Sequence, residues 1–339
     1  MKTFKSIAIL ALAALSLAAC KKSEETSFDT AEYDAVVAEA KALVAAASTD
    51  EYPEAAITTL NTAITTAETA FKAVTSQTQV DNLVANLKAA IEAFKAAKYE
   101  DIPASALTFE CKFDGETDKT TGSNAWTLTP ACGPEQVFPT KTYPTYVEGK
   151  VGKAVKLENG ANFDVTGFNP SALGGTALSI AVWVNPSRVY ANNYILSFNR
   201  WSSWKFQLQD GSKPFLTLTG DSCVDMDNET DNSCPANEWH HVAISVDLTA
   251  GTVNFYVDGT LTKEWTNKVS GNIYVPTDGN YLTIGQQCSW EVACGDDWFD
   301  PTSQSENTWS CYWGLLDELK VYNVALTAGQ VSKIYNSEK

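Results

Sequence analysis

The chain has 339 residues, enough for two or three domains, and its formal net charge at pH 7 is −17. This acidity argues against nucleic acid as a partner, because binding to phosphates needs clustered lysine and arginine side chains. The charge fits a solvated, exported protein that faces neutral or cationic partners. The eight cysteines also fit an oxidising compartment.

The first residues have the pattern of an export signal. Lys2 and Lys5 precede an apolar run at 7–14 that is too short to span a membrane comfortably, which predicts a cleaved signal peptide at 1–19. The Leu-Ala-Ala-Cys sequence that ends at Cys20 resembles the bacterial lipobox. The resemblance implies cleavage before Cys20 and its acylation, so that the lipid anchor alone would hold the protein at a membrane.

Residues 20–27 form a short polar tether. Its basic and then acidic charges resemble the signals that send some Gram-negative lipoproteins to the outer face of the outer membrane. That resemblance implies an outer membrane lipoprotein exposed at the cell surface, with periplasmic retention as the alternative. Seven cysteines remain beyond Cys20, so at least one thiol should be unpaired. None forms a Cys-x-x-Cys pair, which argues against a zinc or thioredoxin-like site.

Residues 28–99 predict an antiparallel bundle of three helices. The segment is rich in Ala, Thr and Glu, contains no glycine, and repeats apolar side chains at steps of three and four residues. Pro53 suits the first turn of the second helix, and Ser76 with Gln79 predicts a capping box for the third. The apolar stripes run from Tyr33 to Val44, from Ile57 to Val74 and from Val80 to Phe94.

This helical segment resembles the small modules of bacterial surface proteins that are often called FIVAR-type repeats. The resemblance covers residues 28–99, and its motif consists of spaced Ala, Ile and Leu. Such modules act as sugar binders or as spacers. No aromatic cluster marks a site in this sequence, and we therefore interpret the bundle as a stalk.

Residues 104–339 predict one large antiparallel β-sandwich. Gly, Trp, Tyr and Asn become frequent, and short runs of alternating β-branched residues are separated by Gly and Asp turns. The Asp258-Gly259 pair between two such runs favours a tight hairpin turn. The fold class is therefore mainly β, preceded by the three-helix bundle.

Five motifs occur in the order of a known family. They are AVWVNP at 181–186, NEWHHVAISVD at 237–247, VNFYVDG at 253–259, LTIG at 282–285 and GLLDELKVYNVALTAGQV at 314–331. Together they resemble the laminin-G-like, concanavalin A-like jelly roll of lectins and glucanases. The family implies two curved antiparallel sheets, frequent carbohydrate binding and commonly a structural calcium ion. It does not identify the ligand, because one fold supports many functions.

The resemblance also places the calcium. By analogy with the family, Asp114 in the early FDG turn and Asp317 in the late Asp-Glu strand are the expected metal ligands. The acidic residues 225–231 lie between Cys223 and Cys234, and they would form a closed loop if these cysteines paired. That loop could collect oxygen ligands for calcium, or it could be a solvated acidic loop, which is the interpretation we favour.

Tryptophans and arginine outside the family motifs are the candidate sugar ligands, because sugar binding uses aromatic faces with a few polar groups. Residues 200–204 place two indoles near a guanidinium, and Arg200 with Trp201 could equally be a local cation–π pair. Residues 286–313 form an aromatic-rich insertion that either binds ligand or packs against the sandwich. The candidates are Arg200, Trp201, Trp204, Trp290, Asp297, Trp298, Trp309 and Trp313.

The sequence predicts a surface-anchored protein that binds a polysaccharide or other glycan without cutting it, as an accessory to outer-membrane glycan-uptake components. A glycoside hydrolase is the first alternative, but it needs two carboxylates at a fixed separation, and no strand carries the glucanase pattern. An adhesin for a protein partner is the second alternative. His240 and His241 are adjacent on a predicted strand and point to opposite faces, which favours structural roles for both.

Overall fold

The computed structural model describes residues 27–115 and 119–339, so the predicted signal peptide, Cys20 and most of the tether lie outside the described residues. The chain divides into two compact units. One comprises Thr58–Lys95 with the chain up to Ala46, and the other comprises Ala47–Ile57 with Ala96–Lys339. Within the described ranges, no helix is long and apolar enough to cross a membrane.

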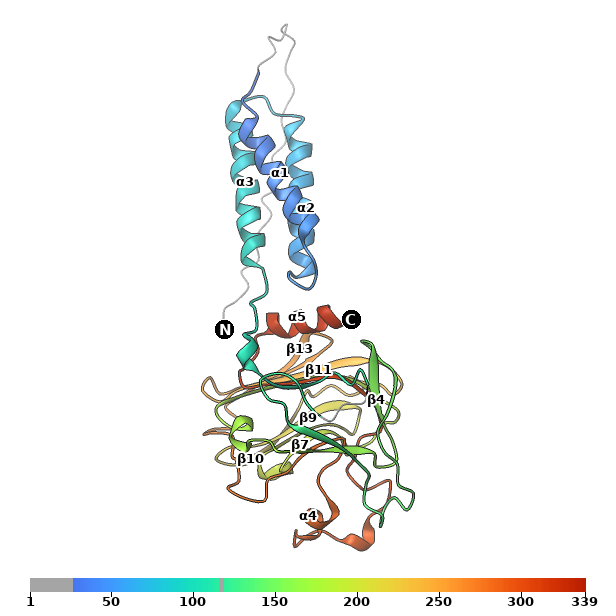
Figure 1. Cartoon of the computed structure of the whole chain (residues 1–339). Helices are drawn as coiled ribbons and strands as arrows, with labels where there is room; N and C mark the ends of the chain where they lie inside the picture. Colours follow the sequence, from blue (N-terminus) through green and yellow to red (C-terminus); the bar gives the residue numbers. More distant parts are fainter. Residues whose placement is uncertain (1–26, 116–118) are drawn as a thin grey trace. The chain divides into compact units, whose positions relative to one another are not determined.

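Most of the first unit consists of three helices (Figure 1), as the sequence predicts. They are α1 (Ala31–Ala46), α2 (Glu54–Phe71) and α3 (Gln77–Ala96). Each helix buries one apolar stripe, because residues three and four apart share a face. The ring of Tyr33 in α1 stacks on that of Phe71 in α2, with centroids 4.1 Å apart. The buried side chains are Tyr33, Val36, Ala40, Leu60, Ile64, Ala67, Val80, Val84, Leu87, Ile91 and Phe94.

The helix ends follow the sequence signals with one difference. Pro53 directly precedes α2, where its missing N–H removes no helical hydrogen bond. The hydroxyl of Ser76 accepts a hydrogen bond of 3.3 Å from the N–H of Gln79, as a capping box requires. The side chain of Gln79, however, accepts from the N–H of Thr75, so only half of the predicted box forms.

The second unit is a sandwich of two antiparallel sheets, which confirms the predicted fold class. The 8-stranded sheet has the order β13-β12-β11-β6-β15-β4-β3, with β1 also paired to β15, and the 7-stranded sheet has the order β10-β9-β8-β7-β14-β5-β2. The strands of the first sheet are β1 (Leu107–Cys111), β3 (Thr145–Glu148), β4 (Lys153–Leu157), β6 (Ala177–Pro186), β11 (His240–Asp247), β12 (Thr252–Val257), β13 (Thr260–Thr266) and β15 (Gly314–Tyr322). Those of the second are β2 (Thr127–Ala131), β5 (Asn162–Thr166), β7 (Asn193–Phe198), β8 (Trp204–Gln209), β9 (Lys213–Thr219), β10 (Cys223–Asp227) and β14 (Leu282–Ile284).

Alternation along the strands builds the core between the sheets. In β8, for example, Trp204, Phe206 and Leu208 point into the core, while the residues between them point outward. The hairpin between β12 and β13 turns at Asp258 and Gly259, whose φ angles are 49° and 73°. Two left-handed residues are what a type I′ turn requires, so the predicted tight turn is present.

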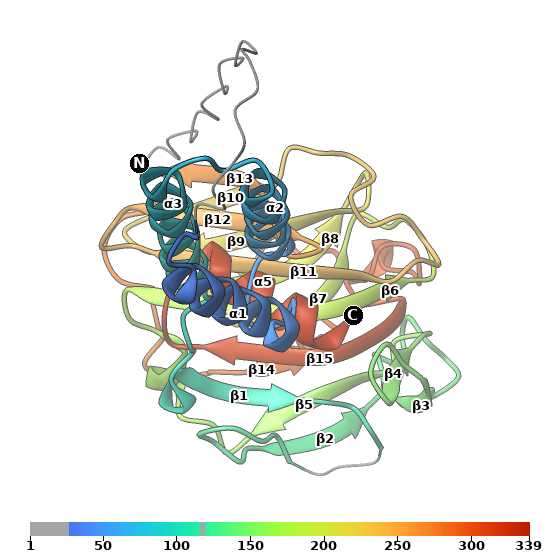
Figure 2. The ribbon, with the colours of Figure 1, turned by 90° about the horizontal axis from the view of Figure 1, so that it is seen from above.

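Each sheet is covered on its outer face by a different part of the chain. Helix α5 (Ala328–Glu338) lies across the 8-stranded sheet, over β6, β11 and β15 (Figure 2), and packs Val331 and Ile334 against Ala181 and Ala243. The short helix α4 (Trp290–Cys294) belongs to the 286–313 insertion and lies on the side of the sandwich away from α5 (Figure 1). A ligand can therefore approach the sandwich beside α4, over the 7-stranded sheet.

Candidate functional site

A row of polar residues crosses the outer face of the 7-stranded sheet. Strand pairing places one residue of each strand directly beside the next. These positions alternate with core residues such as Phe163 and Val165 of β5, so their side chains point outward. From β2 to β10 the row consists of Thr129, Asp164, Thr283, Ser197, Lys205, Thr217 and Asp225.

The middle of this row is covered by protein. The hydroxyl of Ser197 donates to the carbonyl of Gln287 at the start of the insertion, over 2.9 Å. Lys205 is buried, and its ammonium group donates to Gln207 over 2.7 Å. Burial lowers the pKa of Lys205 to about 8, because desolvation penalises the charged form. Ligand access to the row is therefore confined to its two ends.

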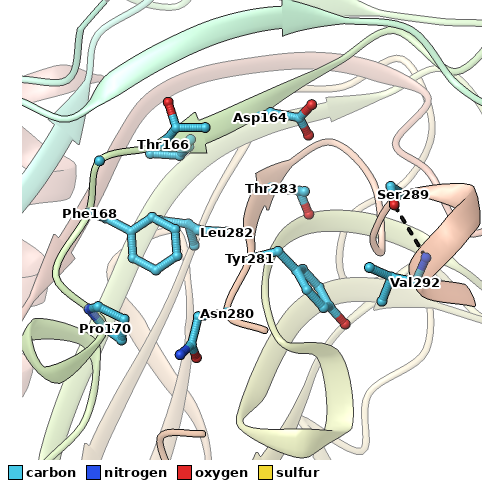
Figure 3. Close-up of a pocket in the computed structure, with 12 residues that line it drawn as sticks. Asp164, Thr166, Phe168, Pro170, Asn280, Tyr281, Leu282, Thr283, Ser289 and Val292 are labelled. Carbon is cyan, nitrogen blue, oxygen red and sulfur yellow. Dashed lines mark hydrogen bonds between the residues drawn. The ribbon is translucent and has the colours of Figure 1, made fainter. Parts of the chain in front are cut away.

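A cavity of about 460 Å³ opens at the Asp164 end of the row. In Figure 3, Phe168 and Pro170 lie along one side, Tyr281 and Val292 lie along the other, and Leu282 lies between the rings of Phe168 and Tyr281. We call this hollow the Tyr281 cavity. Its lining residues are Asp164, Val165, Thr166, Gly167, Phe168, Pro170, Asn280, Tyr281, Leu282, Thr283, Ser289 and Val292.

Most polar side chains of the Tyr281 cavity are already paired within the protein. Thr283 donates to the carbonyl of Gln286 over 2.7 Å, and the hydroxyl of Ser289 caps α4 by accepting from the N–H of Val292 over 3.3 Å. Asp164 is different, because its carboxylate has no hydrogen-bond or ion-pair partner among the described residues. Partial burial raises the pKa of Asp164. A half-desolvated carboxyl without a partner is ready to bind a donor from a ligand.

Arg200 joins this cavity to the neighbouring surface. Its Nε donates to the hydroxyl of Tyr281 over 2.8 Å, and its Nη2 donates to the carboxylate of Asp296 over 2.7 Å. Only 3% of the residue is exposed. Asn199 and Arg200 both adopt left-handed backbone angles, with φ of 53° and 49°. Such conformations persist where surrounding contacts hold them, and here two hydrogen bonds fix the guanidinium group.

Two tryptophans lie on the other side of the guanidinium group. Cζ of Arg200 is 4.4 Å from the ring centroid of Trp201, and the centroid of Trp298 is 5.0 Å from that of Trp201. Trp298 is 64% exposed, although its ring also contacts Phe299 at 6.5 Å. We call this pair the Trp201–Trp298 ledge. Arg200 therefore contacts both the Tyr281 wall of the cavity and the ledge.

Comparison with known families identifies the family of the β-sandwich. The family model of the concanavalin A-like lectin/glucanases superfamily matches residues 158–332. The chain belongs to this superfamily. The matched range contains β5, β14 and α4, the elements that carry the Tyr281 cavity, and both rings of the ledge. No match was found among curated proteins.

Two solved structures are similar to this chain. Domain 4 of AbnA, an extracellular arabinanase of Geobacillus stearothermophilus solved with arabinotriose, is 21% identical with a TM-score of 0.48, and the match covers 68% of this chain and 98% of that domain. The receptor-binding domain of botulinum neurotoxin mosaic serotype C/D is 13% identical with a TM-score of 0.50, covering 69% of this chain. The chain spans 51% of that toxin chain. Identities this low concern the fold alone.

Two of the eight residues predicted to bind sugar lie in the core. Trp204 and Trp309 are 0% exposed, so the expectation that their rings lie at the surface is wrong. Trp204 points inward on β8 and packs against Phe198 with centroids 5.7 Å apart. Trp309 packs against Trp290 at 5.6 Å inside the insertion. Arg200 is also buried. It contacts Tyr281, Asp296 and Trp201 of the site but is not itself exposed to a ligand in solvent.

The other predicted residues of the insertion divide between packing and surface. Trp290 is half-buried against Phe299 as well as Trp309, and Trp313 lies under the guanidinium of Arg188, 3.7 Å from its ring centroid. Asp297 is exposed next to Trp298. The insertion therefore packs some of its side chains into a small core and presents the ring of Trp298 to solvent. That core contains Cys288, Ala293, Trp309 and Cys311 of the insertion together with Val137 and Phe138.

The predicted calcium ligands are engaged by the backbone. Oδ2 of Asp317 accepts from the N–H groups of Lys150 and Val151, both at 2.9 Å, and Oδ1 of Asp114 accepts from the N–H of Lys153 at 3.2 Å. Both carboxylates thus hold the turn between β3 and β4. No group of three or more His, Cys, Asp or Glu side chains that could hold a metal ion occurs among the described residues. Calcium stays a prediction from the family resemblance.

The acidic residues do not lie in a loop closed by a disulfide between Cys223 and Cys234. All seven cysteines of the described residues are unpaired, including Cys223, which is exposed, and Cys234, which is buried. Asp225 accepts from the hydroxyl of Thr217 over 2.6 Å, and Asp227 accepts from Gln209 over 2.7 Å. These carboxylates therefore stabilise neighbouring strands.

Several residues of the candidate site were missed from the sequence. Asp164, Phe168 and Tyr281 come from segments that carry no motif of charge or aromatic clustering. The single available signal was Asp164 itself, a carboxylate within the strand-like run Asn162–Thr166 whose neighbours alternate with apolar residues. Tyr281 directly precedes the LTIG motif, and nothing in the sequence distinguishes its ring from those of core aromatics.

Proposed function

We propose that the β-sandwich binds carbohydrate in the Tyr281 cavity without cutting it. One observation carries the proposal: the unpartnered carboxylate of Asp164 lies in a hollow walled by the rings of Phe168 and Tyr281. Aromatic faces bind the C–H groups of a sugar ring, and a carboxylate accepts from its hydroxyls. Membership of the concanavalin A-like lectin/glucanases superfamily supports the same ligand class.

The spacing of carboxylates supports binding over hydrolysis. A glycosidase needs two carboxyl groups about 5 to 9.5 Å apart across the scissile bond. In the polar row of the described sheet, the carboxylates are Asp164 on β5 and Asp225 on β10, which are separated by five strand spacings. At about 4.8 Å per spacing the sheet keeps them roughly 20 Å or more apart. Asp164 is also the one carboxylate among the residues that line the Tyr281 cavity.

A glycan array followed by calorimetry tests the proposal. Asp164→Ala is expected to weaken binding to the best glycan at least tenfold, because the variant loses a charge-assisted hydrogen bond. Asp225→Ala, at the other end of the same row, is the matched control and should bind like the wild type. Equal binding by both variants would show that the cavity is not the site, and release of reducing ends from the polysaccharides would show a hydrolase.

We also propose that the protein is an outer membrane lipoprotein, anchored through Cys20 and exposed at the cell surface, where it serves glycan-uptake components. The lipobox-like sequence and the basic and then acidic tether support this localisation. Cys20→Ala is expected to move the protein from the membrane fraction to the soluble fraction. Protease added to intact cells should degrade the anchored wild type, whereas full protection would indicate the periplasmic side.

A further inference from the structure

The exposed ring of Trp298 is held in place by neighbouring aromatic rings. The 286–313 insertion buries Trp309 completely, yet it leaves 64% of Trp298 in contact with solvent. Contacts with Trp201 at 5.0 Å and Phe299 at 6.5 Å hold the exposed ring in place. A large apolar side chain that is fixed at the surface beside a cavity is typical of a binding surface.

Arg200 fixes the ledge relative to the cavity. One guanidinium group donates to the hydroxyl of Tyr281, donates to Asp296 and covers the ring of Trp201. Asp296 lies two residues before Trp298, so the same ion pair also holds the segment that carries the exposed indole. Cavity and ledge therefore keep a constant separation, which is what a site of several aromatic positions needs.

We propose that the Trp201–Trp298 ledge extends the carbohydrate site, so that the protein binds an internal stretch of a neutral polysaccharide instead of a single terminal sugar. This inference rests on the proposed function. A chain of contacts through the guanidinium group of Arg200 and the ring of Trp201 joins Tyr281 to Trp298. We therefore expect a ligand that contacts both positions to span more than one sugar residue.

The charges at both positions disfavour an anionic glycan. The unpartnered carboxylate of Asp164 lies in the cavity, and the exposed carboxylate of Asp297 lies next to Trp298. The guanidinium of Arg200, which contacts the cavity wall through Tyr281, is paired with Asp296 at 2.7 Å. A uronic acid or sulfated sugar would face repulsion at both positions, on a chain whose net charge is already −17.

Calorimetry with oligosaccharides of two to six residues from cello-, xylo-, manno- and malto- series tests the inference, with oligogalacturonides as the anionic comparison. For the series that binds, affinity is expected to rise at least tenfold from the disaccharide to the tetrasaccharide and then to level off. Trp298→Ala should bind the disaccharide like the wild type but lose this gain, and Trp298→Phe should retain most of it. Tyr143→Ala, an exposed aromatic before β3 of the other sheet, should not change either affinity.

The outcomes separate the inference from the function on which it rests. Equal affinity for short and long oligosaccharides, or full affinity of Trp298→Ala for the tetrasaccharide, overturns the extended site. Preference for oligogalacturonides overturns the neutral class. In each case binding that remains sensitive to Asp164→Ala would leave the proposed function standing. Binding to none of the series would overturn both.

Discussion

The hydroxyl group of Tyr281 accepts a hydrogen bond of 2.8 Å from Nε of Arg200, while the ring of the same tyrosine lines the cavity. Tyr281 therefore has two separable contributions, one from its ring and one from its hydroxyl. Nη1 of Arg200 has no partner among the described residues, so the guanidinium depends on Tyr281 and Asp296 for its hydrogen bonds.

Replacing Tyr281 by phenylalanine should separate these contributions. Tyr281→Phe keeps the ring but leaves a second nitrogen of Arg200 unpaired, which should lower the free energy of unfolding by about 1 to 3 kcal/mol. Glycan affinity below the unfolding transition should change less than threefold, whereas Tyr281→Ala should lose both stability and affinity. Chemical denaturation and calorimetry measure the two effects. An unchanged free energy of unfolding in Tyr281→Phe would show that the hydroxyl does not support Arg200.

Trp204 and Trp298 were both predicted to bind sugar, but replacing them should change the free energy of unfolding by very different amounts. Trp204→Ala empties a fully buried core position, and we expect it to lower the free energy of unfolding by about 3 to 5 kcal/mol. Trp298→Ala removes a ring that is 64% exposed and should change it by less than about 1 kcal/mol. Thermal unfolding of the two variants compares these costs directly. Equal losses would contradict the difference in burial.

His241 should make the protein less stable in acid. It is fully buried, and burial lowers its pKa to about 3, with a smaller contribution from nearby Lys320. Below about pH 6.5 the unfolded chain binds a proton on this imidazole that the folded chain does not bind, so the free energy of unfolding falls as pH decreases. Between pH 6.5 and 5 the loss is about 2 kcal/mol. His241→Phe should remove this loss, which denaturation at several pH values would show.

The neighbouring His240 provides a control, because its effect on the pH dependence of stability should have the opposite sign. A hydrogen bond to Asp258, 2.9 Å long, raises the pKa of His240. The folded chain therefore binds this proton more tightly than the unfolded chain, and the stability that it contributes is present at acidic pH and is lost as pH rises through the raised pKa. His240→Gln should lower stability in acid, whereas His241→Phe should raise it. A change of the same sign in both variants would refute the assignment.

Among the charged residues of the sandwich, Lys320 should be the one whose substitution lowers the free energy of unfolding most. Its ammonium group lies 2.6 Å from Glu338 and 3.3 Å from Glu110, and it also pairs with Glu318. Lys320→Met would leave these largely buried carboxylates without their cation, and we expect a loss of about 3 to 5 kcal/mol at pH 7. The loss should shrink at acidic pH as Glu338, whose pKa is raised by burial, becomes protonated. A loss that does not depend on pH would indicate a packing defect instead.

Features that depend on local sequence were predicted well. The apolar steps of three and four residues that predict three helices are the stripes that those helices bury. The Asp258-Gly259 pair forms its hairpin because two left-handed residues are needed there and this pair tolerates them. The five ordered motifs predicted the jelly roll for a similar reason, because each of them contains most or all of one strand of the sandwich.

The candidate site depends on information that local patterns do not contain. Asp164 and Thr283 become neighbours through the register between β5 and β14, which no turn connects directly. Trp298 and Trp309 come from one insertion with similar surroundings in sequence, and only tertiary packing exposes the first and buries the second. Trp204 was a different error, because its alternation with Lys205 and Gln207 already indicated an inward side chain.

The packing of α5 makes the last residues of the chain part of the sandwich. Glu338 accepts from the indole N–H of Trp183 over 2.9 Å and pairs with Lys320, so it connects the end of α5 to β6 and β15. Shortening the protein by only its final two residues would strip both groups of an acceptor beneath the helix. Expression variants intended for binding studies should therefore keep Glu338, and any affinity tag should be joined through a flexible spacer after Lys339.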